Sequence, residues 1–337
     1  MREITIADRP IGDRHPVFII AEIGINHNGS IEVARQIIDM AHMAGADAAK
    51  FQKRHIPAVY TKEELSKPRE IPRALLENAL KCRRLPEESV RRLERTGFTE
   101  TTNGDQKWML EFGRDDYVQI FEHCAAKDML CFASPWDSES VAFMERFNPP
   151  CYKIASASAT DDELLLTIKE TGRPVILSTG GCNLPMIRHA VSVLGTENLA
   201  ILHCTACYIK PVLGSEEVSR MVNLRAIQTL RDSFPTIPIG FSSHYSGVMP
   251  AIHAVTLGAS IVETHVTLER SMYGSDHASS LEPHEFRNMC QSIREFDILQ
   301  GDGNIHIYSQ EVETMKKLRR VWSPDQAKLF AQSQTKL

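Results

Sequence analysis

The sequence has no excess of positive charge and no long apolar segment. Its 337 residues carry 38 Lys and Arg against 43 Asp and Glu, a formal net charge of -5, so the bulk charge does not attract nucleic acid or an anionic membrane. No run of apolar residues is long enough to span a bilayer, and residues 1–16 are polar, unlike a secretory signal. These absences predict a cytoplasmic protein that binds neither nucleic acid nor membrane.

The eight cysteines form no disulfide framework along the sequence. They are scattered through apolar runs and helix-like segments, which favours reduced thiols. Cys204 and Cys207 form a C-x-x-C pair, but the second pair that a structural zinc site needs is missing. The redox version of the motif normally opens a helix in a thioredoxin-like unit. We therefore interpret this spacing as chance.

Short runs rich in Val, Ile and Ala alternate with amphipathic helical patterns, which is typical of βα units around a parallel sheet. We predict eight strands, at 17–24, 47–52, 129–134, 151–158, 174–179, 199–205, 237–243 and 260–267. A helical segment follows each of them, at 30–44, 115–127, 137–147, 161–171, 183–194, 217–233, 248–257 and 283–299. Eight βα pairs in order predict an α/β fold, a closed (β/α)₈ TIM barrel, over an open doubly wound sheet. The segment "GINHNG" after the first strand also lacks the glycine spacing of a dinucleotide site.

Two regions depart from this regular spacing. Residues 53–114 form a long insertion after strand two, rich in Lys and Arg. An insertion of this length at the carboxyl end of a barrel strand is typical of a lid or binding element, and we expect it to be partly helical. The sequence turns polar after residue 300. We expect a catalytic barrel over 1–300 and a short C-terminal tail over 301–337, with one amphipathic stretch near 310–320.

Two lysines stand out among the polar residues at the ends of the predicted strands, where a barrel builds its active site. Lys50 and Lys153 lie in apolar strands, and a lysine buried there is rarely left unpaired. Together with Ser134, Ser156 and Ser178 they would form a cationic, hydroxyl-rich pocket for a small phosphate or carboxylate. The alternative is that the lysines only form internal ion pairs.

Two histidines end neighbouring predicted strands. A single His at a strand end is more often a hydrogen-bonded structural residue than a ligand. His244 and His265, however, end strands in adjacent units. Two converging imidazoles can hold a divalent cation and leave positions open for water and substrate, so we predict a metal site there.

Several stretches through most of the chain read as one set of motifs: "FIIAEIGINHNGS" (18–30), "GADAAKFQK" (45–53), "YKIASAS" (152–158), "RPVILSTG" (173–180), "HCT" (203–205), "IPIGFSSHYSG" (237–247), "GASIVETHVTL" (258–268) and "GSDHASSLEP" (274–283). In their order and spacing, these stretches resemble the sialic acid synthase (N-acetylneuraminate synthase) family. Enzymes of that family condense phosphoenolpyruvate with an amino-sugar aldehyde, such as N-acetylmannosamine, to make nonulosonic acids.

The resemblance implies roles for the matching positions. Glu22 would be the acid/base group. His244 and His265 would bind a divalent metal, Mn²⁺ first, with Mg²⁺ or Co²⁺ as alternatives. Phosphoenolpyruvate would be held by Lys50, Ser134, Lys153, Ser156, Ser178 and Ser242, and the sugar would lie near Gln52, Tyr208 and Asp276. A homodimer is also implied.

The departures from the family pattern all fall on the sugar side. Members commonly continue into a C-terminal antifreeze-like domain that lends an arginine to the partner's sugar site, and we expect none in this sequence. Ala206 stands where the family often has a polar residue, Ile209 replaces its usual proline, and Ser158 stands where some members have an acid. Use of phosphoenolpyruvate is therefore better supported than any particular acceptor.

Three other functions stay open at this point. One is a non-catalytic sugar-binding or assembly protein derived from the family, and another is a synthase for a different 2-keto-3-deoxy sugar acid. The third is a metal-dependent sugar isomerase on the same barrel, which would explain the histidines but not the anion pocket.

Overall fold

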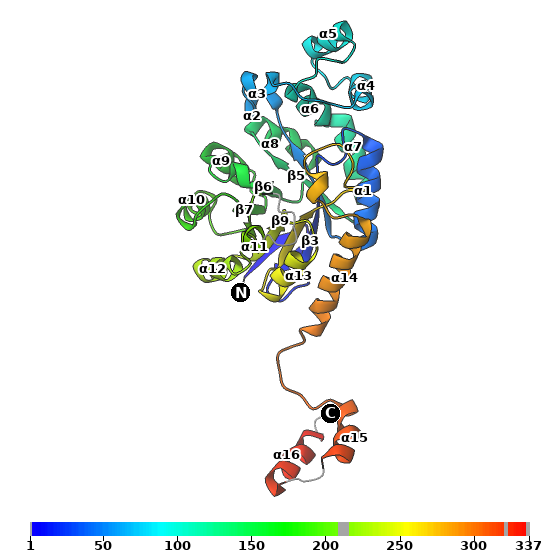
Figure 1. The fold of residues 1–337 in the computed structure, drawn as a ribbon. Helices are drawn as coiled ribbons and strands as arrows, with labels where there is room; N and C mark the ends of the chain where they lie inside the picture. Colours follow the sequence, from blue (N-terminus) through cyan, green and yellow to red (C-terminus); the bar gives the residue numbers. More distant parts are fainter. Residues whose placement is uncertain (1, 208–215, 320–322, 335–337) are drawn as a thin grey trace. The chain divides into compact units, whose positions relative to one another are not determined.

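The computed structural model describes residues 2–207, 216–319 and 323–334 of the chain. Within them, eight parallel strands form one sheet in the unit Met1–Glu295 (Figure 1). The strands are β3 (Phe18–Gly24), β4 (Ala48–Lys53), β5 (Leu130–Pro135), β6 (Tyr152–Ile154), β7 (Val175–Ser178), β8 (Leu199–Cys204), β9 (Ile239–Ser243) and β10 (Ile261–His265). Their order is β5-β4-β3-β10-β9-β8-β7-β6, and the two end strands, β5 and β6, contact each other. The sheet therefore curls into a nearly closed barrel, which confirms the predicted fold.

Helices lie around the outside of the barrel, as Figure 1 shows. They are α1 (Ile31–Ala44), α7 (Arg114–Ala125), α8 (Ser138–Met144), α9 (Asp162–Glu170), α10 (Leu184–Leu194), α12 (Ala226–Ser233), α13 (Met249–Thr256) and α14 (Pro283–Leu299). Local chemistry sets their ends. The Ser30 hydroxyl accepts from the backbone N–H of Val33 at the start of α1, and Gly45 ends that helix in the left-handed region, with φ 92°.

Two predicted elements are wrong in detail. The single helix expected over 217–233 is two helices, α11 (Glu216–Arg220) and α12, because Asn223 between them has a positive φ of 46°, which no α-helix accommodates. The strand expected over 151–158 ends at Ile154. Ser156–Ser158 form a 3₁₀ turn instead, and the Ser156 hydroxyl accepts from the backbone N–H of Gly180.

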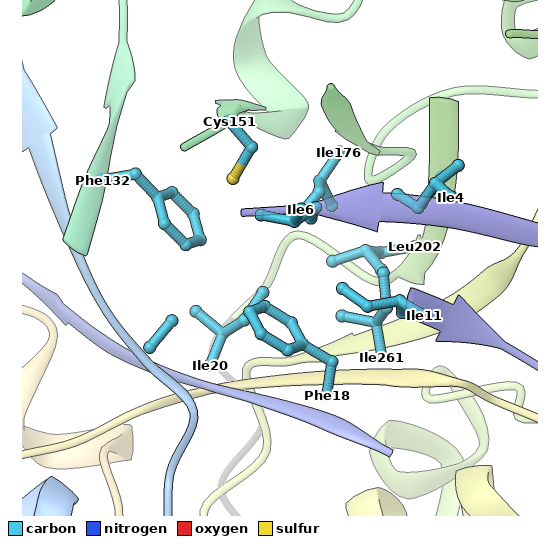
Figure 2. Close-up of a cluster of buried hydrophobic side chains, with 12 residues drawn as sticks. Ile4, Ile6, Ile11, Phe18, Ile20, Phe132, Cys151, Ile176, Leu202 and Ile261 are labelled. Atoms are coloured by element: carbon cyan, nitrogen blue, oxygen red, sulfur yellow. The ribbon is translucent and has the colours of Figure 1, made fainter. Parts of the chain in front are cut away.

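The sequence analysis missed an antiparallel hairpin at the amino-terminal end. Its strands β1 (Glu3–Ile6) and β2 (Arg9–Gly12) are joined by Ala7 and Asp8, both with positive φ, the backbone of a tight hairpin turn. The inward residues of the hairpin, Ile4, Ile6 and Ile11, pack among apolar side chains near the starts of the barrel strands, including Phe18 and Ile261 (Figure 2). The hairpin thus closes the amino end of the barrel.

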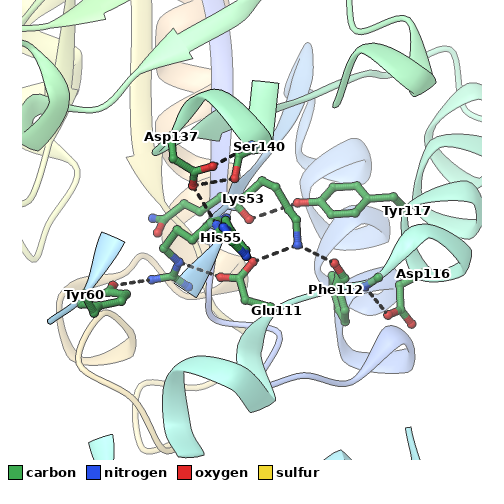
Figure 3. A network of polar contacts seen from close by, with 12 residues as sticks. Lys53, His55, Tyr60, Glu111, Phe112, Asp116, Tyr117, Asp137 and Ser140 are labelled. Atoms are coloured by element: carbon green, nitrogen blue, oxygen red, sulfur yellow. Dashed lines mark hydrogen bonds and ion pairs between the residues drawn. The ribbon is translucent and has the colours of Figure 1, made fainter. Parts of the chain in front are cut away.

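The insertion after β4 is helical over much of its length. Its described helices are α2 (Ile56–Val59), α3 (Lys62–Ser66), α4 (Arg73–Lys81), α5 (Glu87–Thr96) and α6 (Asn103–Leu110), and they gather at one end of the barrel in Figure 1. They have a small core of their own, around Leu76, Leu93 and Met109. The Glu111 carboxylate fastens the end of the insertion to β4, contacting Arg54 Nε at 2.7 Å and Lys53 Nζ at 3.2 Å (Figure 3).

A second compact unit, Phe296–Leu337, contains α15 (Ser309–Leu318) and α16 (Pro324–Gln334). Across the described residues of both units, no helix combines the length and the apolar character that crossing a bilayer requires.

Candidate active site

A cavity of about 200 Å³ lies at the carboxyl ends of the barrel strands. Ten of the predicted site residues line it: Glu22, Lys50, Gln52, Ser134, Lys153, Ser156, Ser178, Ser242, His244 and His265. Asp276 is not in the lining, but its Oδ2 lies 4.0 Å from His265 Nδ1. Tyr208 and Ile209 fall outside the described residues. The structure therefore gathers most of the predicted set in one place, because alternate residues of each strand point to the same side of the sheet.

Both buried lysines are paired with carboxylates. Lys50 Nζ lies 2.7 Å from Glu22 Oε2 and 3.6 Å from Glu263 Oε2, and Lys153 Nζ lies 3.5 Å from Glu263 Oε1. All four side chains are buried. The two interpretations of the lysines are thus both realised: they form internal ion pairs, and they line the cavity with the serines.

The two lysines differ in how strongly they hold their protons. Burial opposes the charge of Lys50, but Glu22 and Glu263 outweigh it and raise the pKa of that ammonium. Burial dominates at Lys153, and although Glu263 opposes it, the repulsion from Lys50 adds to it and the pKa of Lys153 is lowered. Two lysines thus share two carboxylates in a buried site, where an added anion would interact strongly.

The serines have different partners. Ser134 Oγ accepts from Lys50 Nζ at 3.1 Å, and Ser242 Oγ donates to Glu263 Oε1 at 3.0 Å. Ser178 Oγ is buried without a hydrogen-bond partner among the described residues. A buried hydroxyl in that state is costly unless something else bonds to it. Ser178 therefore offers a donor to a ligand in the cavity.

His244 and His265 face each other with ring centroids 5.1 Å apart. Burial, and then the neighbouring His265, lower the pKa of His244 to about 3. The imidazole is therefore neutral near pH 7, the form that binds metals. Within the described part of the chain, no three His, Cys, Asp or Glu side chains together form a metal-binding cluster. A cation at this pair would need water and substrate oxygens at its remaining positions.

The pair C-x-x-C shows no bond between its thiols. All eight cysteines lie in the described residues and are free. Cys204 Sγ lies 3.5 Å from His244 Nδ1, so this thiol belongs to the surroundings of the histidine pair.

Sequence reasoning assigned no role to Glu263 and missed Trp136, and both line the cavity. A signal for Glu263 existed: it stands two residues before His265 on one strand, so the two side chains share the inward face. Trp136 stands in the same relation to Ser134, directly after β5. Ser243, next to Ser242, is not in the cavity lining, and its hydroxyl accepts from the backbone N–H of Tyr245.

Comparisons with known proteins agree with this geometry. A sequence model of the NeuB family matches residues 37–305. Human N-acetylneuraminate-9-phosphate synthase is 31% identical over 317 residues, covering 92% of this chain and 78% of the human protein. N,N'-diacetyllegionaminic acid synthase of Campylobacter jejuni is 30% identical over 322 residues, covering 90% of this chain and 86% of that enzyme.

A solved structure shares the fold of this chain. The crystal structure of N-acetylneuraminic acid (sialic acid) synthetase from Leptospira borgpetersenii, in complex with citrate, superimposes with a TM-score of 0.70 at 29% identity. The match covers 95% of this chain and 98% of that one.

Proposed function

Because this chain belongs to the NeuB family, we propose that it condenses phosphoenolpyruvate with an amino-sugar aldehyde, forming a nonulosonic acid and releasing phosphate. The observation that carries the proposal is the single cavity lined by Glu22, Lys50, Lys153 and the histidine pair. A sugar isomerase has no use for two buried lysines beside the unpaired Ser178 hydroxyl, whereas these groups suit a phosphate-bearing substrate.

Phosphoenolpyruvate binds at the lysines and serines. Its carboxylate and phosphate need several fixed cations and donors, and Lys50, Lys153 and Ser178 point into the same cavity. Such preorganised groups hold the substrate and stabilise the charge that develops during reaction without having to reorient. Ser134, Ser156 and Ser242 complete the ring of hydroxyls.

His244 and His265 would hold a divalent cation, Mn²⁺ first. When bound, such a cation would supply Lewis-acid activation of the acceptor aldehyde. The chain's own contribution is two closely spaced imidazoles at the cavity wall, of which His244 is neutral near pH 7.

Glu22 moves the protons. Its Oε1 accepts from Gln52 Nε2 at 3.0 Å and its Oε2 lies 2.7 Å from Lys50 Nζ, so the carboxylate is held from both sides. The enol carbon of phosphoenolpyruvate forms the new bond to the aldehyde carbon. The aldehyde oxygen takes up one proton as this bond forms, and water adds to the carbon that bears the phosphate ester. The new hydroxyl passes its proton to the departing phosphate as the carbon–oxygen bond breaks, which leaves the ketone. The first proton of the water goes to a base. Glu22 is the carboxylate placed to take that proton.

The acceptor belongs to the N-acyl amino-sugar aldehydes. Relatives make different nonulosonic acids, as their names state, and the positions that depart from the family pattern lie on the sugar side. The protein works in the cytoplasm as a homodimer.

The test is phosphate release from phosphoenolpyruvate in the presence of Mn²⁺ and a panel of amino-sugar aldehydes. We expect release only when an acceptor and the metal are both present. His244→Ala abolishes this turnover and keeps the fold, while His253→Ala, an exposed histidine on α13, behaves as wild type.

Two results would overturn the proposal. One is sugar binding without turnover for every acceptor, which would instead support a non-catalytic binding protein. The other is a His244→Ala variant that keeps its metal-dependent activity.

A further inference from the structure

The thiol of Cys204 lies directly behind one of the two histidines. Its Sγ is 3.5 Å from His244 Nδ1, a distance that suits a hydrogen bond to the large sulfur atom. Cys204 is only 5% exposed, and it is not among the residues that line the active-site cavity. The thiol is therefore placed to act on the histidine and not on a molecule bound in the cavity.

The register of the barrel strands fixes this contact. Leu202 of β8 packs in the core of the barrel, so Cys204, two residues later, points to the same side of the sheet. Cys204 is paired with Ser242 of the neighbouring strand β9, and His244 comes two residues after Ser242. The thiol and the imidazole thus meet at the carboxyl ends of adjacent strands.

The proton on the imidazole decides which nitrogen can bind a metal. A neutral imidazole has one N–H and one nitrogen with a lone pair, and only the latter binds a cation. With the proton on Nδ1, the N–H of His244 donates to Cys204 Sγ and the lone pair lies on Nε2. With the proton on Nε2, the thiol can donate to Nδ1, and a cation at Nε2 would first have to displace that proton. A bound cation therefore selects the arrangement in which the sulfur is the acceptor.

His265 shows the same relation to a different group. Asp276 Oδ2 lies 4.0 Å from His265 Nδ1, and the two imidazole rings have their centroids 5.1 Å apart. In both histidines a protein group approaches Nδ1, so Nε2 is the nitrogen that each ring would present to a cation. Histidines that bind metals generally donate their other N–H to a fixed acceptor, which sets the tautomer and the orientation of the ring. The acceptor on the His244 side is the sulfur of Cys204.

We propose that Cys204 is a positioning residue for the metal site: its sulfur accepts from His244 Nδ1–H and holds the imidazole with Nε2 toward the cation. The proposal rests on the metal ligands of the proposed function. It gives a role to a cysteine that neither ligates the metal nor touches the substrate.

Titration of the protein with Co²⁺ tests this role without any turnover, because the visible absorption of bound Co²⁺ reports both its affinity and its ligands. Cys204→Ala should weaken Co²⁺ binding on the order of 10-fold, the lower end of the range for losing such a partner, because sulfur is a weak acceptor. Cys204→Ser, which restores an acceptor on a shorter side chain, should lose less affinity than Cys204→Ala. The control is Cys290→Ala, a buried cysteine on α14, which should bind Co²⁺ as the wild type does.

Binding of phosphoenolpyruvate separates positioning from general damage to the cavity. Calorimetry without added metal should give the same affinity for phosphoenolpyruvate in Cys204→Ala as in the wild type, because the lysines and serines proposed to hold that substrate are unchanged. Cys204→Ala should therefore lose affinity for the cation alone.

Three results would overturn the role of Cys204. The first is equal Co²⁺ affinity in Cys204→Ala and the wild type, and the second is an equal loss of Co²⁺ and phosphoenolpyruvate affinity. The third is a sulfur-to-cobalt charge-transfer band that disappears in Cys204→Ala, because the thiolate would then be a ligand itself. Any of these with turnover intact leaves the synthase in place. Weaker Co²⁺ binding by Cys204→Ala, in a protein whose wild type shows no turnover, would support the positioning role and contradict the synthase.

Discussion

At the scale of single residues, Glu263 is the carboxylate that contacts both buried lysines of the cavity, although the sequence analysis gave it no role. One carboxylate lies within 3.6 Å of two ammonium groups and accepts from Ser242. Burial opposes its charge, but Lys153 and Lys50 outweigh burial and hold the pKa of Glu263 well below its usual range. Glu263 is thus the counter-ion that Lys50 and Lys153 share.

Replacing that carboxylate by an amide exposes its role. In Glu263→Gln the free energy of unfolding should fall by about 3 kcal/mol, the cost of breaking a buried ion pair by removing one partner. Inorganic phosphate should restore stability to this variant more than it stabilises the wild type, because the anion neutralises the two lysines. Denaturant unfolding with and without phosphate measures both effects. A matched Glu163→Gln change, at an exposed position of α9, should neither lower the free energy of unfolding nor add to the effect of phosphate. A Glu263→Gln protein as stable as the wild type would contradict the role of Glu263 as the shared counter-ion.

Lys107 predicts a pH dependence of stability. Its pKa is lower in the folded protein than in the unfolded chain, so its charge destabilises the fold below about pH 8. That cost is relieved as pH rises from about 8 toward the unfolded value of 10.5. Lys107→Met should therefore raise the free energy of unfolding at pH 7 by about 1–2 kcal/mol. This value is smaller than the full pKa shift implies, because water reaches part of the side chain. The gain should be smaller at pH 10.

Urea unfolding at the two pH values measures this difference, with Lys81→Met as the control. A loss of stability in Lys107→Met at pH 7 would show that the lysine is paired. The expected gain would show that the charge of Lys107 destabilises the fold.

At the scale of elements, the hairpin β1–β2 shows what pattern reading overlooks. Ile4 and Ile6 alternate with polar residues as in any half-buried strand, but the connecting Ala-Asp is not a recognised turn pair, and charges surround it. The barrel strands were predictable because their apolar runs are buried on both faces. The helix break at Asn223 and the 3₁₀ turn at Ser156 could not be predicted, because they depend on single backbone angles and on tertiary hydrogen bonds.

The hairpin should stabilise the barrel without taking part in chemistry. Ile6 is fully buried at the amino end, so Ile6→Ala should lower the free energy of unfolding by about 2–5 kcal/mol. Thr5→Ala, at the exposed neighbouring position, should change it by less than about 0.5 kcal/mol. Urea midpoints measure both changes, and turnover of folded Ile6→Ala protein should match the wild type. A change of less than about 0.5 kcal/mol in Ile6→Ala would mean that the hairpin does not plug the barrel.

At the scale of the whole molecule, the barrel explains why sequence alone located most of the site. Polar residues at the ends of parallel strands meet at one face, so Lys50, Lys153 and His265 could be grouped before their distances were known. The pairing of the two lysines with Glu22 and Glu263 could not be predicted, because it depends on side-chain conformation across strands.

The measurement that tests the central claim most directly is mass spectrometry of the products from phosphoenolpyruvate labelled with oxygen-18 at the bridging position, an N-acyl amino-sugar aldehyde and Mn²⁺. The account predicts an acid one pyruvate unit heavier than the acceptor, with the label in the released phosphate because the carbon–oxygen bond breaks. Free pyruvate with an unchanged acceptor, or label retained in the acid, would contradict it.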